Sequence, residues 1–254
     1  AYAASRQNLA IARDDLLPIS PVNGGDYGFH PTMGGMANLF AQGQCAVVAN
    51  VGPLIAPTTL DQYRAKSVPI PPQLFSHNDQ QDQWHTLRGR LPSKTGWAGR
   101  MADLLAGRLS GQQLATNVSL SGTTLFQAGT TATPYIMGAT GAQLFKAFGA
   151  SGQKLARQSA FERIIGLDQQ AVYGRAYAEV HQRAFASAQR VNSALKSAPA
   201  LATSFPASSL ATQLKTVAKM IAVREQLSMS RQVFFVAAGG FDTHDEQVEE
   251  QPGL

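Results

Sequence analysis

Cysteine is almost absent from this sequence. Cys45 stands alone among 254 residues, so the chain can form neither an internal disulfide nor a metal site built from several thiolates. Its apolar neighbours at residues 46–51 favour a buried and unreactive thiol. A mechanism based on a cysteine nucleophile is therefore not expected.

Runs of lysine or arginine are also absent. The formal net charge is +5 and the sequence pI is about 9.5, but charged residues make up only 15% of the chain and the basic ones are scattered. They do not alternate with aromatic side chains, as they commonly do in RNA-binding surfaces. Nucleic acid is therefore not expected as a partner.

Long apolar runs are missing as well. No stretch approaches the roughly 20 apolar residues that cross a bilayer as a helix, so we expect no transmembrane segment. No export signal is present, the chain starts with Ala1 rather than methionine, and its most informative motif lies close to its last residue. We therefore expect a fragment that lacks material at both ends.

Alternating strand and helix signals predict an α/β fold. Apolar runs predict buried strands at residues 45–51 and 232–236, and shorter strands are expected at 117–120 and 124–126. Helices are expected where a capping residue precedes a polar or amphipathic stretch. These stretches are residues 36–41, 58–63, 76–85 and 96–105.

A long helical segment separates the strand signals. Residues 161–195 are alanine-rich and predict one helix. A second helix follows, in which Leu210, Leu214, Val217 and Ile221 share one apolar face. We expect a single domain over residues 1–254 that carries a helical insertion at 159–228.

The most informative segment follows the last predicted strand. Residues 239–244 read GGFDTH, so a glycine pair leads from the strand into Asp242 and His244. Carboxylate and imidazole groups are ligands for divalent ions such as zinc, manganese or calcium. In an extended segment, side chains two residues apart point the same way, so this pair is predicted to hold one ion. A solvated acidic loop after the turn is the alternative.

Ser76 is the second candidate. It ends a proline-rich extended segment and begins a helix, where its hydroxyl lies beside free backbone N–H groups at the positive end of the helix dipole. This environment favours phosphate or sulfate binding and attack by the hydroxyl, whereas an ordinary N-cap is the alternative. His77 and Asn78 follow in the first turn. Asp82 and His85 share a helix face, which predicts either a metal or proton-donor site or a solvated surface.

A Ser-His-Asp triad made by Ser76, His244 and Asp242 is the competing chemistry. No Gly-x-Ser-x-Gly segment surrounds Ser76, which is the usual setting of such a serine in α/β-hydrolases. Asp242 and His244 also lie too close in sequence to form the usual orienting pair easily. Both observations disfavour the triad.

Five short motifs resemble the DUF1501 family. They are RQNLAI at residues 6–11, VVANVGPL at 47–54, LFSHNDQQ at 74–81, TGWAGR at 95–100 and GGFDTH at 239–244. The motifs occur in the right order, and the resemblance covers nearly the whole chain.

This resemblance implies membership of the alkaline phosphatase-like superfamily and a three-layer α/β/α sandwich, incomplete in this chain. It also implies one or two divalent metal ions, a Ser, Thr or modified Cys nucleophile that attacks phosphate or sulfate esters, and twin-arginine export to a periplasmic or extracellular location. Asp242 and His244 match the superfamily's metal segment, although its phosphatases commonly space the two residues four apart rather than two. Later family segments, Ser-Asp-Phe-Gly-Arg and Asp-His-Gly-Trp, do not occur here, so further ligands are expected outside this chain.

The combined prediction is a metal-dependent hydrolase of a small-molecule or polymeric phosphate or sulfate ester. A non-catalytic exported binding protein on the same fold and a serine hydrolase of carboxylic esters are the alternatives. The assigned residues are Ser76 and His77 in catalysis, Arg100 and Asn78 in substrate binding, and Asp242 and His244 as metal ligands.

Overall fold

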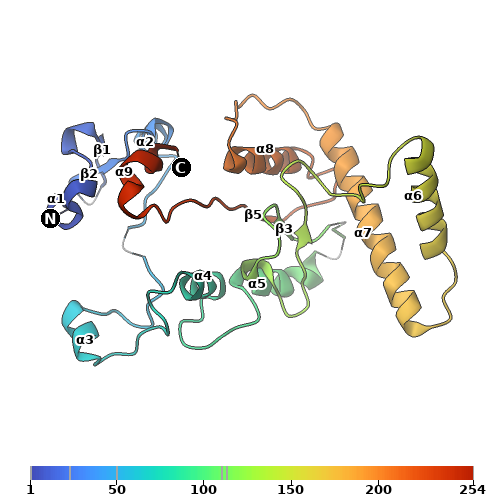
Figure 1. Cartoon of the computed structure of the whole chain (residues 1–254), viewed down its shortest axis with the longest axis horizontal. Helices are drawn as coiled ribbons and strands as arrows, with labels where there is room; N and C mark the ends of the chain where they lie inside the picture. The colour runs from blue at the N-terminus through green and yellow to red at the C-terminus, as the bar shows by residue number, and fades with distance from the viewer. Residues whose placement is uncertain (1, 23, 50, 110, 113, 254) are drawn as a thin grey trace. The chain divides into compact units, whose positions relative to one another are not determined.

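The structure is a computed structural model that describes residues 2–22, 24–49, 51–109, 111–112 and 114–253. These residues form helices and short strands, which agrees with the α/β class predicted from the sequence. The chain divides into two compact units (Figure 1). Unit 1 comprises residues 1–52 and 238–254, and unit 2 comprises residues 53–237.

Unit 1 is built from short elements. They are α1 (Tyr2–Arg6), η1 (Gln7–Leu9), η2 (Arg13–Asp15), β1 (Leu17–Ile19), β2 (Tyr27–Phe29), α2 (Gly34–Ala41), η5 (His244–Glu246), α9 (Gln247–Glu250) and η6 (Gln251–Gly253). Strands β1 and β2 pair antiparallel. The rings of Phe29 and Phe40 meet edge to face with 6.1 Å between centroids, so α2 packs on this pair. Arg6 donates a hydrogen bond to Gln247, which links two parts of unit 1 that are distant in sequence.

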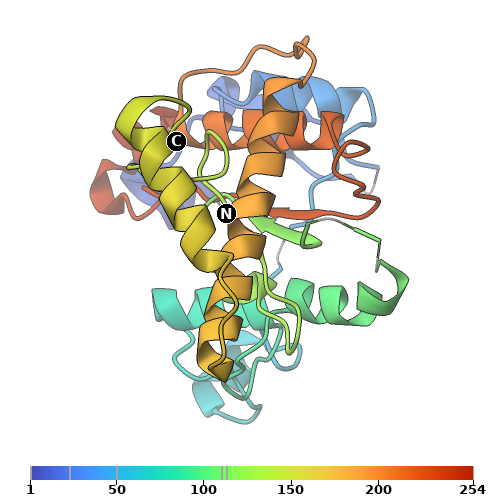
Figure 2. The ribbon, with the colours of Figure 1, turned by 90° about the vertical axis from the view of Figure 1, so that its right-hand side faces the viewer.

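Unit 2 contains the longer helices and a parallel sheet. Its elements are α3 (Leu60–Ala65), α4 (His77–Thr86), α5 (Trp97–Leu105), η3 (Ala106–Arg108), β3 (Asn117–Ser119), η4 (Leu125–Gln127), β4 (Tyr135–Ile136), α6 (Gly152–Ile165), α7 (Val172–Lys196), α8 (Ser209–Ala222) and β5 (Val233–Phe235). The described residues form a three-stranded sheet in the order β4–β3–β5, with both pairings parallel. Figures 1 and 2 both show α6 lying beside α7.

The side chains of successive β3 residues lie on opposite faces of the sheet. Val118 is fully buried in an apolar core with Val191 of α7 and Met220 of α8. The buried amide of Asn117 instead donates to the Ala98 carbonyl oxygen in α5. The two-residue period of a strand produces this division. Helices therefore contact both faces of this small sheet.

The TGWAGR segment brings α5 unusually close to η4. A Cβ atom on Gly96 would lie 2.1 Å from a backbone carbonyl oxygen of η4, and one on Gly99 would lie 2.0 Å from the Ala128 carbonyl oxygen. Between these glycines, the Trp97 ring meets the Phe126 ring edge to face at 4.7 Å between centroids. The glycines therefore let two backbones touch while the tryptophan packs beside them.

Several predicted elements are confirmed within a few residues. Helices α3, α4 and α5 begin directly after the N-cap residues Thr59, Ser76 and Gly96. Strands β3 and β5 coincide with the apolar runs at 117–120 and 232–236. Capping chemistry and β-branched or aromatic runs were reliable local signals in these places.

The strand predicted at residues 45–51 is wrong over the described part of that range. Residues 45–49 and 51 belong to no strand, Cys45 is half-buried rather than buried, and Val48 is 80% exposed. Asn50 lies outside the described residues. An apolar run becomes a strand only when a neighbouring strand satisfies its backbone groups, and no described strand pairs with this run.

The strand predicted at 124–126 is also wrong. Residues 125–127 form the 3-10 helix η4, which begins where the Thr124 hydroxyl accepts a hydrogen bond from the Phe126 N–H at 3.3 Å. A threonine side chain that bonds to a nearby backbone N–H competes with strand pairing. The local bond therefore decided the structure of this short segment.

The helical segment departs from prediction in two ways. The single helix expected over residues 161–195 is instead α6 and α7, which are separate helices. On α8 the buried face carries Thr216 and Met220, whereas Leu214 is 42% exposed and Ile221 is 47% exposed. Of the predicted apolar face of α8, Val217 packs against the core and Leu210 is half-buried, but Leu214 and Ile221 are exposed, so the prediction is wrong for these last two residues. The single domain with an insertion at 159–228 stays a prediction.

Asp103 on α5 is held by the loop that follows η4. Its carboxylate accepts hydrogen bonds from the backbone N–H groups of Ala132, Thr130 and Thr131, at 2.7, 2.6 and 3.1 Å. These bonds, first that from Ala132 and then that from Thr130, hold the pKa of the Asp103 carboxyl well below its usual range. The charged carboxylate thus fixes the loop onto α5.

We expect Asp103→Asn to unfold more easily than the parent chain at neutral pH, with a difference that shrinks as the pH falls below 3.8. A carboxyl whose pKa is lowered by folding contributes stability above its unfolded pKa, and that contribution is lost as the folded carboxylate becomes protonated. Urea unfolding of both proteins at neutral pH and at about pH 3 measures this difference. An equal difference at both pH values would contradict the assignment.

Candidate functional site

Ser76 lies at the N-terminus of α4, as predicted. Its backbone is extended, with φ −82° and ψ 127°, and its hydroxyl oxygen accepts a hydrogen bond from the Asp79 N–H at 3.4 Å. Because the hydroxyl acts as the acceptor in this long bond, its own proton remains available to a base. The half-buried side chain therefore lies beside the first-turn N–H groups of a helix.

His77 and Asn78 occupy the first turn of α4 and are exposed. The structure therefore keeps both close to Ser76 along the chain, in the turn where backbone N–H groups lack helical partners. Asp79 is half-buried in the same turn, and its charge lies at the end of the helix that favours an anion. The catalytic role of His77 and the binding role of Asn78 stay predictions.

His85 shares a face of α4 with Asp82, but its surroundings are aromatic. Its ring lies 5.6 Å from the Phe235 ring and 6.2 Å from the Phe126 ring, measured between centroids. Desolvation by this packing lowers the pKa of His85, and the charge of Asp82 opposes the shift. His85 therefore joins α4 to β5 and η4 by packing, while Asp82 is exposed.

Arg100 binds the backbone at the junction of α4 and α5. Its guanidinium donates to the Thr86 carbonyl oxygen at 2.7 Å and to the Thr95 carbonyl oxygen at 2.8 Å. Sequence reasoning assigned Arg100 to substrate and missed this role, which becomes visible only once α4 and α5 are placed together. A guanidinium has five N–H donors, so its proposed contact with an anion stays a prediction.

Asp242 and His244 lie in unit 1, whereas Ser76 and Arg100 lie in unit 2. The extended backbone predicted for this pair is wrong, because Thr243 has φ −84° and ψ −7° and His244 has a left-handed φ of 48°. The resulting turn places His244 Nε2 3.3 Å from Asp242 Oδ1. The two side chains do meet, through a turn rather than through the alternation of a strand.

The contact between His244 Nε2 and Asp242 Oδ1 has the length of an ordinary ion pair, and this length is also compatible with two ligands of one ion. Two donors that each lie about 2.1 Å from a metal at a tetrahedral angle are about 3.4 Å apart, close to the 3.3 Å observed. Both side chains are largely exposed, at 76% for His244 and 63% for Asp242, so an ion can reach them. Among the described residues, no cluster of three or more His, Cys, Asp or Glu side chains is placed to hold a metal ion.

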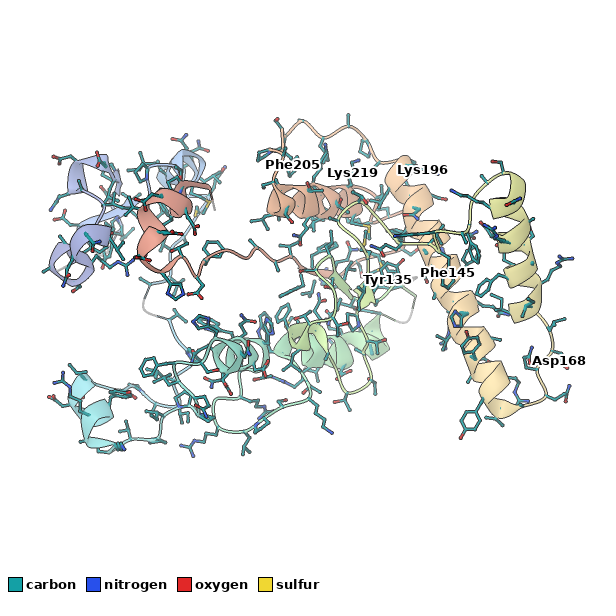
Figure 3. All side chains as sticks on the ribbon, in the orientation of Figure 1. Tyr135, Phe145, Asp168, Lys196, Phe205 and Lys219 are labelled. Carbon is teal, nitrogen blue, oxygen red and sulfur yellow. The ribbon has the colours of Figure 1, made fainter. Side chains whose placement is uncertain are left out.

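A cavity of about 1350 Å³ lies elsewhere in unit 2, between α6, α7, α8 and the loops that precede α6 and α8. Its lining includes Lys196, Lys215 and Lys219, none of which the sequence singled out. One signal for this cluster was present in the sequence. Lys215 and Lys219 are four residues apart, which places both on one face of a helix. Figure 3 shows Lys196, Lys219 and Phe205 in this part of unit 2.

Comparison with known proteins found no matching family model, no matching curated protein and no matching solved structure. Within the part of the chain that the structure describes, no helix has the length and apolar character needed to span a bilayer.

Proposed function

We propose that this protein is a metal-dependent hydrolase of phosphate or sulfate esters, exported from the cytoplasm, with an alkaline phosphatase-like α/β/α fold. The observation that carries the proposal is the contact between Asp242 and His244, two exposed side chains of metal-ligand type at 3.3 Å. The parallel sheet of unit 2, with helices against both faces, supports this fold.

In this proposal Asp242 Oδ1 and His244 Nε2 hold the ion in unit 1. A divalent ion such as zinc, manganese or calcium, when bound, supplies Lewis acidity toward an ester oxygen. The left-handed backbone of His244 supports this role, because it turns the imidazole back toward Asp242 in a conformation that non-glycine residues rarely adopt.

Ser76 is the proposed nucleophile in unit 2. Its hydroxyl lies at the positive end of α4, where backbone N–H groups stabilise a developing alkoxide and the oxygens of a phosphate or sulfate group. His77, exposed in the next position, is the proposed acceptor of the hydroxyl proton. Asn78 and the remaining donors of Arg100 would bind anionic oxygens of the substrate.

A non-catalytic exported binding protein on the same fold is the second candidate. Two observations favour it. The guanidinium of Arg100 already donates to two backbone carbonyl oxygens, and the described residues supply only two clustered metal ligands. The third candidate, a serine hydrolase of carboxylic esters, gains no support from this contact, because Asp242 meets His244 at Nε2, the nitrogen that a triad needs for its serine, rather than at Nδ1.

Hydrolysis of p-nitrophenyl phosphate and p-nitrophenyl sulfate, before and after treatment with EDTA, tests the proposal. We expect one of these esters to be cleaved, with at least about a tenfold loss on chelation and recovery when zinc, manganese or calcium is returned. Cleavage of p-nitrophenyl acetate that survives chelation would support the serine hydrolase instead. A protein that binds metal but cleaves none of the three esters would support the binding protein.

A further inference from the structure

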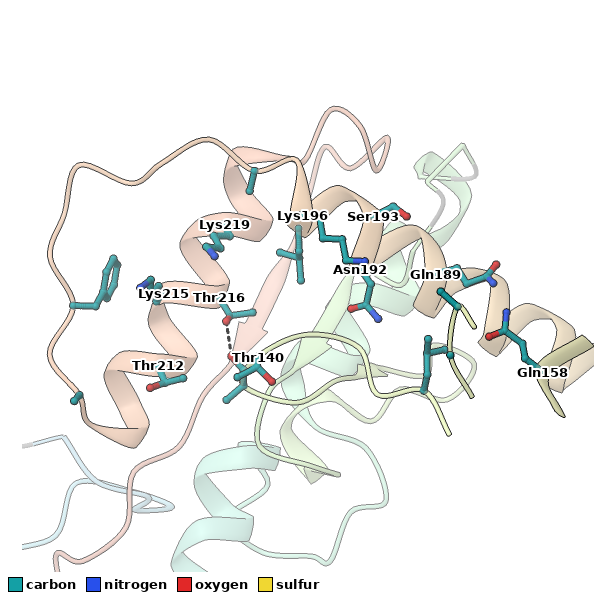
Figure 4. A pocket seen from close by; sticks show the side chains of 18 of the residues that line it. Thr140, Gln158, Gln189, Asn192, Ser193, Lys196, Thr212, Lys215, Thr216 and Lys219 are labelled. Carbon is teal, nitrogen blue, oxygen red and sulfur yellow. Dashed lines mark hydrogen bonds between the residues drawn. The ribbon is translucent and has the colours of Figure 1, made fainter. Parts of the chain in front are cut away.

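The cavity between α7 and α8 has walls that are fixed by side chain to backbone hydrogen bonds. Asn192 of α7 donates to the Ala142 carbonyl oxygen at 2.9 Å and accepts from the Ala142 N–H at 3.0 Å. Thr216 of α8 donates to the Ala139 carbonyl oxygen, as the dashed line in Figure 4 shows. The loop of residues 138–142 is therefore tied to both helices, and the cavity exists before any ligand enters.

The charge of this cavity has one sign. Lys196 comes from the last turn of α7, and Lys215 and Lys219 come from one face of α8 (Figure 4). No Asp or Glu is found among the described lining residues, and none of these three lysines takes part in an ion pair within the described chain. Three ammonium groups without carboxylate partners create a positive potential in a concave site, which attracts anions.

The size and the neutral lining indicate an extended ligand. A cavity of about 1350 Å³ exceeds the 300–1,000 Å³ typical of small-molecule pockets, so a single sulfate or phosphate ion would fill little of it. Gln158, Gln189 and Ser193 supply amide and hydroxyl groups that can pair with sugar hydroxyls. Phe205 is the one aromatic residue among the described lining, whereas single-stranded nucleic acid is commonly bound on several stacking rings.

We propose that this cavity binds an anionic oligosaccharide, with sulfate or phosphate groups on Lys196, Lys215 and Lys219 and sugar hydroxyls on the neutral polar residues. The site lies wholly within unit 2 and includes neither Ser76 nor the Asp242–His244 pair. Binding at this site does not depend on the proposed hydrolase activity, because it is measured without turnover.

Calorimetric titration of the full chain with a sulfated octasaccharide, and with the same octasaccharide after desulfation, tests the proposal. We expect the sulfated probe to bind and the desulfated probe to bind at least about tenfold more weakly. We also expect the affinity for the sulfated probe to fall as salt is raised, because salt screens the ammonium groups. Equal binding of the two probes, or no binding of the sulfated one, would overturn the proposal.

Charge reversal separates this site from general attraction to a basic protein. The double variant Lys215→Glu/Lys219→Glu should bind the sulfated probe at least about tenfold more weakly, and Lys215→Arg/Lys219→Arg should retain binding. Lys94→Glu, which reverses the charge of one exposed lysine of unit 2 outside the cavity, is the matched control for the single variant Lys215→Glu and should bind like the parent chain. Circular dichroism checks that each variant is folded. An equal loss in Lys94→Glu, or tighter binding of hexaglutamate than of the sulfated probe, would overturn the assignment to an oligosaccharide.

Discussion

Gly99→Ala is expected to lower the free energy of unfolding by at least about 4 kcal/mol. This is a large part of the roughly 5–15 kcal/mol by which typical domains are stable. A methyl group at this position would lie 2.0 Å from the Ala128 carbonyl oxygen, 2.1 Å from its carbon and 2.4 Å from the Gly129 nitrogen. These are backbone atoms, so the clash cannot be relieved by rotating a side chain. Relief requires α5 to move away from η4, which separates the rings of Trp97 and Phe126.

Urea unfolding followed by circular dichroism measures this effect, and Gly107→Ala provides the control. Gly107 lies in η3 directly after α5, and a methyl group there would meet no atom within 4 Å. We expect the free energy of unfolding of Gly107→Ala to lie within about 1 kcal/mol of that of the parent chain, because alanine adds no clash and reduces the conformational freedom of the unfolded state. If Gly99→Ala unfolds at the same urea concentration as Gly107→Ala, the close contact of α5 with η4 is wrong.

Ser76→Ala is expected to reduce the hydrolysis of a phosphate or sulfate ester by roughly three orders of magnitude or more, if Ser76 is the nucleophile as proposed. The substitution removes the attacking oxygen and leaves the backbone N–H groups of α4 in place. It also removes the N-cap, which costs about 1 kcal/mol of stability. Steady-state kinetics, with the concentration of folded protein determined separately, distinguishes the two effects.

Ser208→Ala is the matched control for the loss of an N-cap. The Ser208 hydroxyl accepts a hydrogen bond from the Ala211 N–H at 3.1 Å at the start of α8, much as Ser76 does at the start of α4. We expect Ser208→Ala to show a similar loss of stability and unchanged kcat. Equal activity of Ser76→Ala and Ser208→Ala would remove Ser76 from the mechanism.

The sequence predicted the elements whose formation depends on neighbouring residues. Ser76 and Gly96 marked the starts of α4 and α5 because capping is decided within one turn of the chain. The strands β3 and β5 were visible as apolar runs, and both find a parallel partner in the sheet. The run at residues 45–51 is also apolar but has no described partner, so apolar character alone could not separate it from a strand.

The buried face of α8 could not be predicted from the sequence. Leu214 and Ile221 form an apolar row that is exposed, whereas the helix buries Gln213 and Thr216 together with Ala211 and Met220. Gln213 exchanges two hydrogen bonds with the Ala237 backbone at the end of β5, and Thr216 donates to Ala139. These polar groups can be buried because distant backbone groups satisfy them. Helical period alone cannot reveal partners that are far away in the chain.

The candidate metal pair was found for a reason that proved incomplete. The alternation of side chains along a strand predicts that Asp242 and His244 share a face, but the two meet through a turn in which His244 has a left-handed backbone. A left-handed backbone is uncommon for a histidine, and it could not be predicted from the sequence. Asp242 and His244 stay predicted metal ligands. The turn, and not the alternation of a strand, explains why their side chains meet.

In the proposed hydrolase, Asp242 and His244 hold a divalent ion. Inductively coupled plasma mass spectrometry, after dialysis of the parent chain and of Asp242→Ala/His244→Ala against zinc, manganese or calcium, tests it most directly. We expect the parent chain to retain one of these metals in a fixed molar ratio and the double variant to retain none. Equal metal content in the two proteins, or none in either, would contradict it.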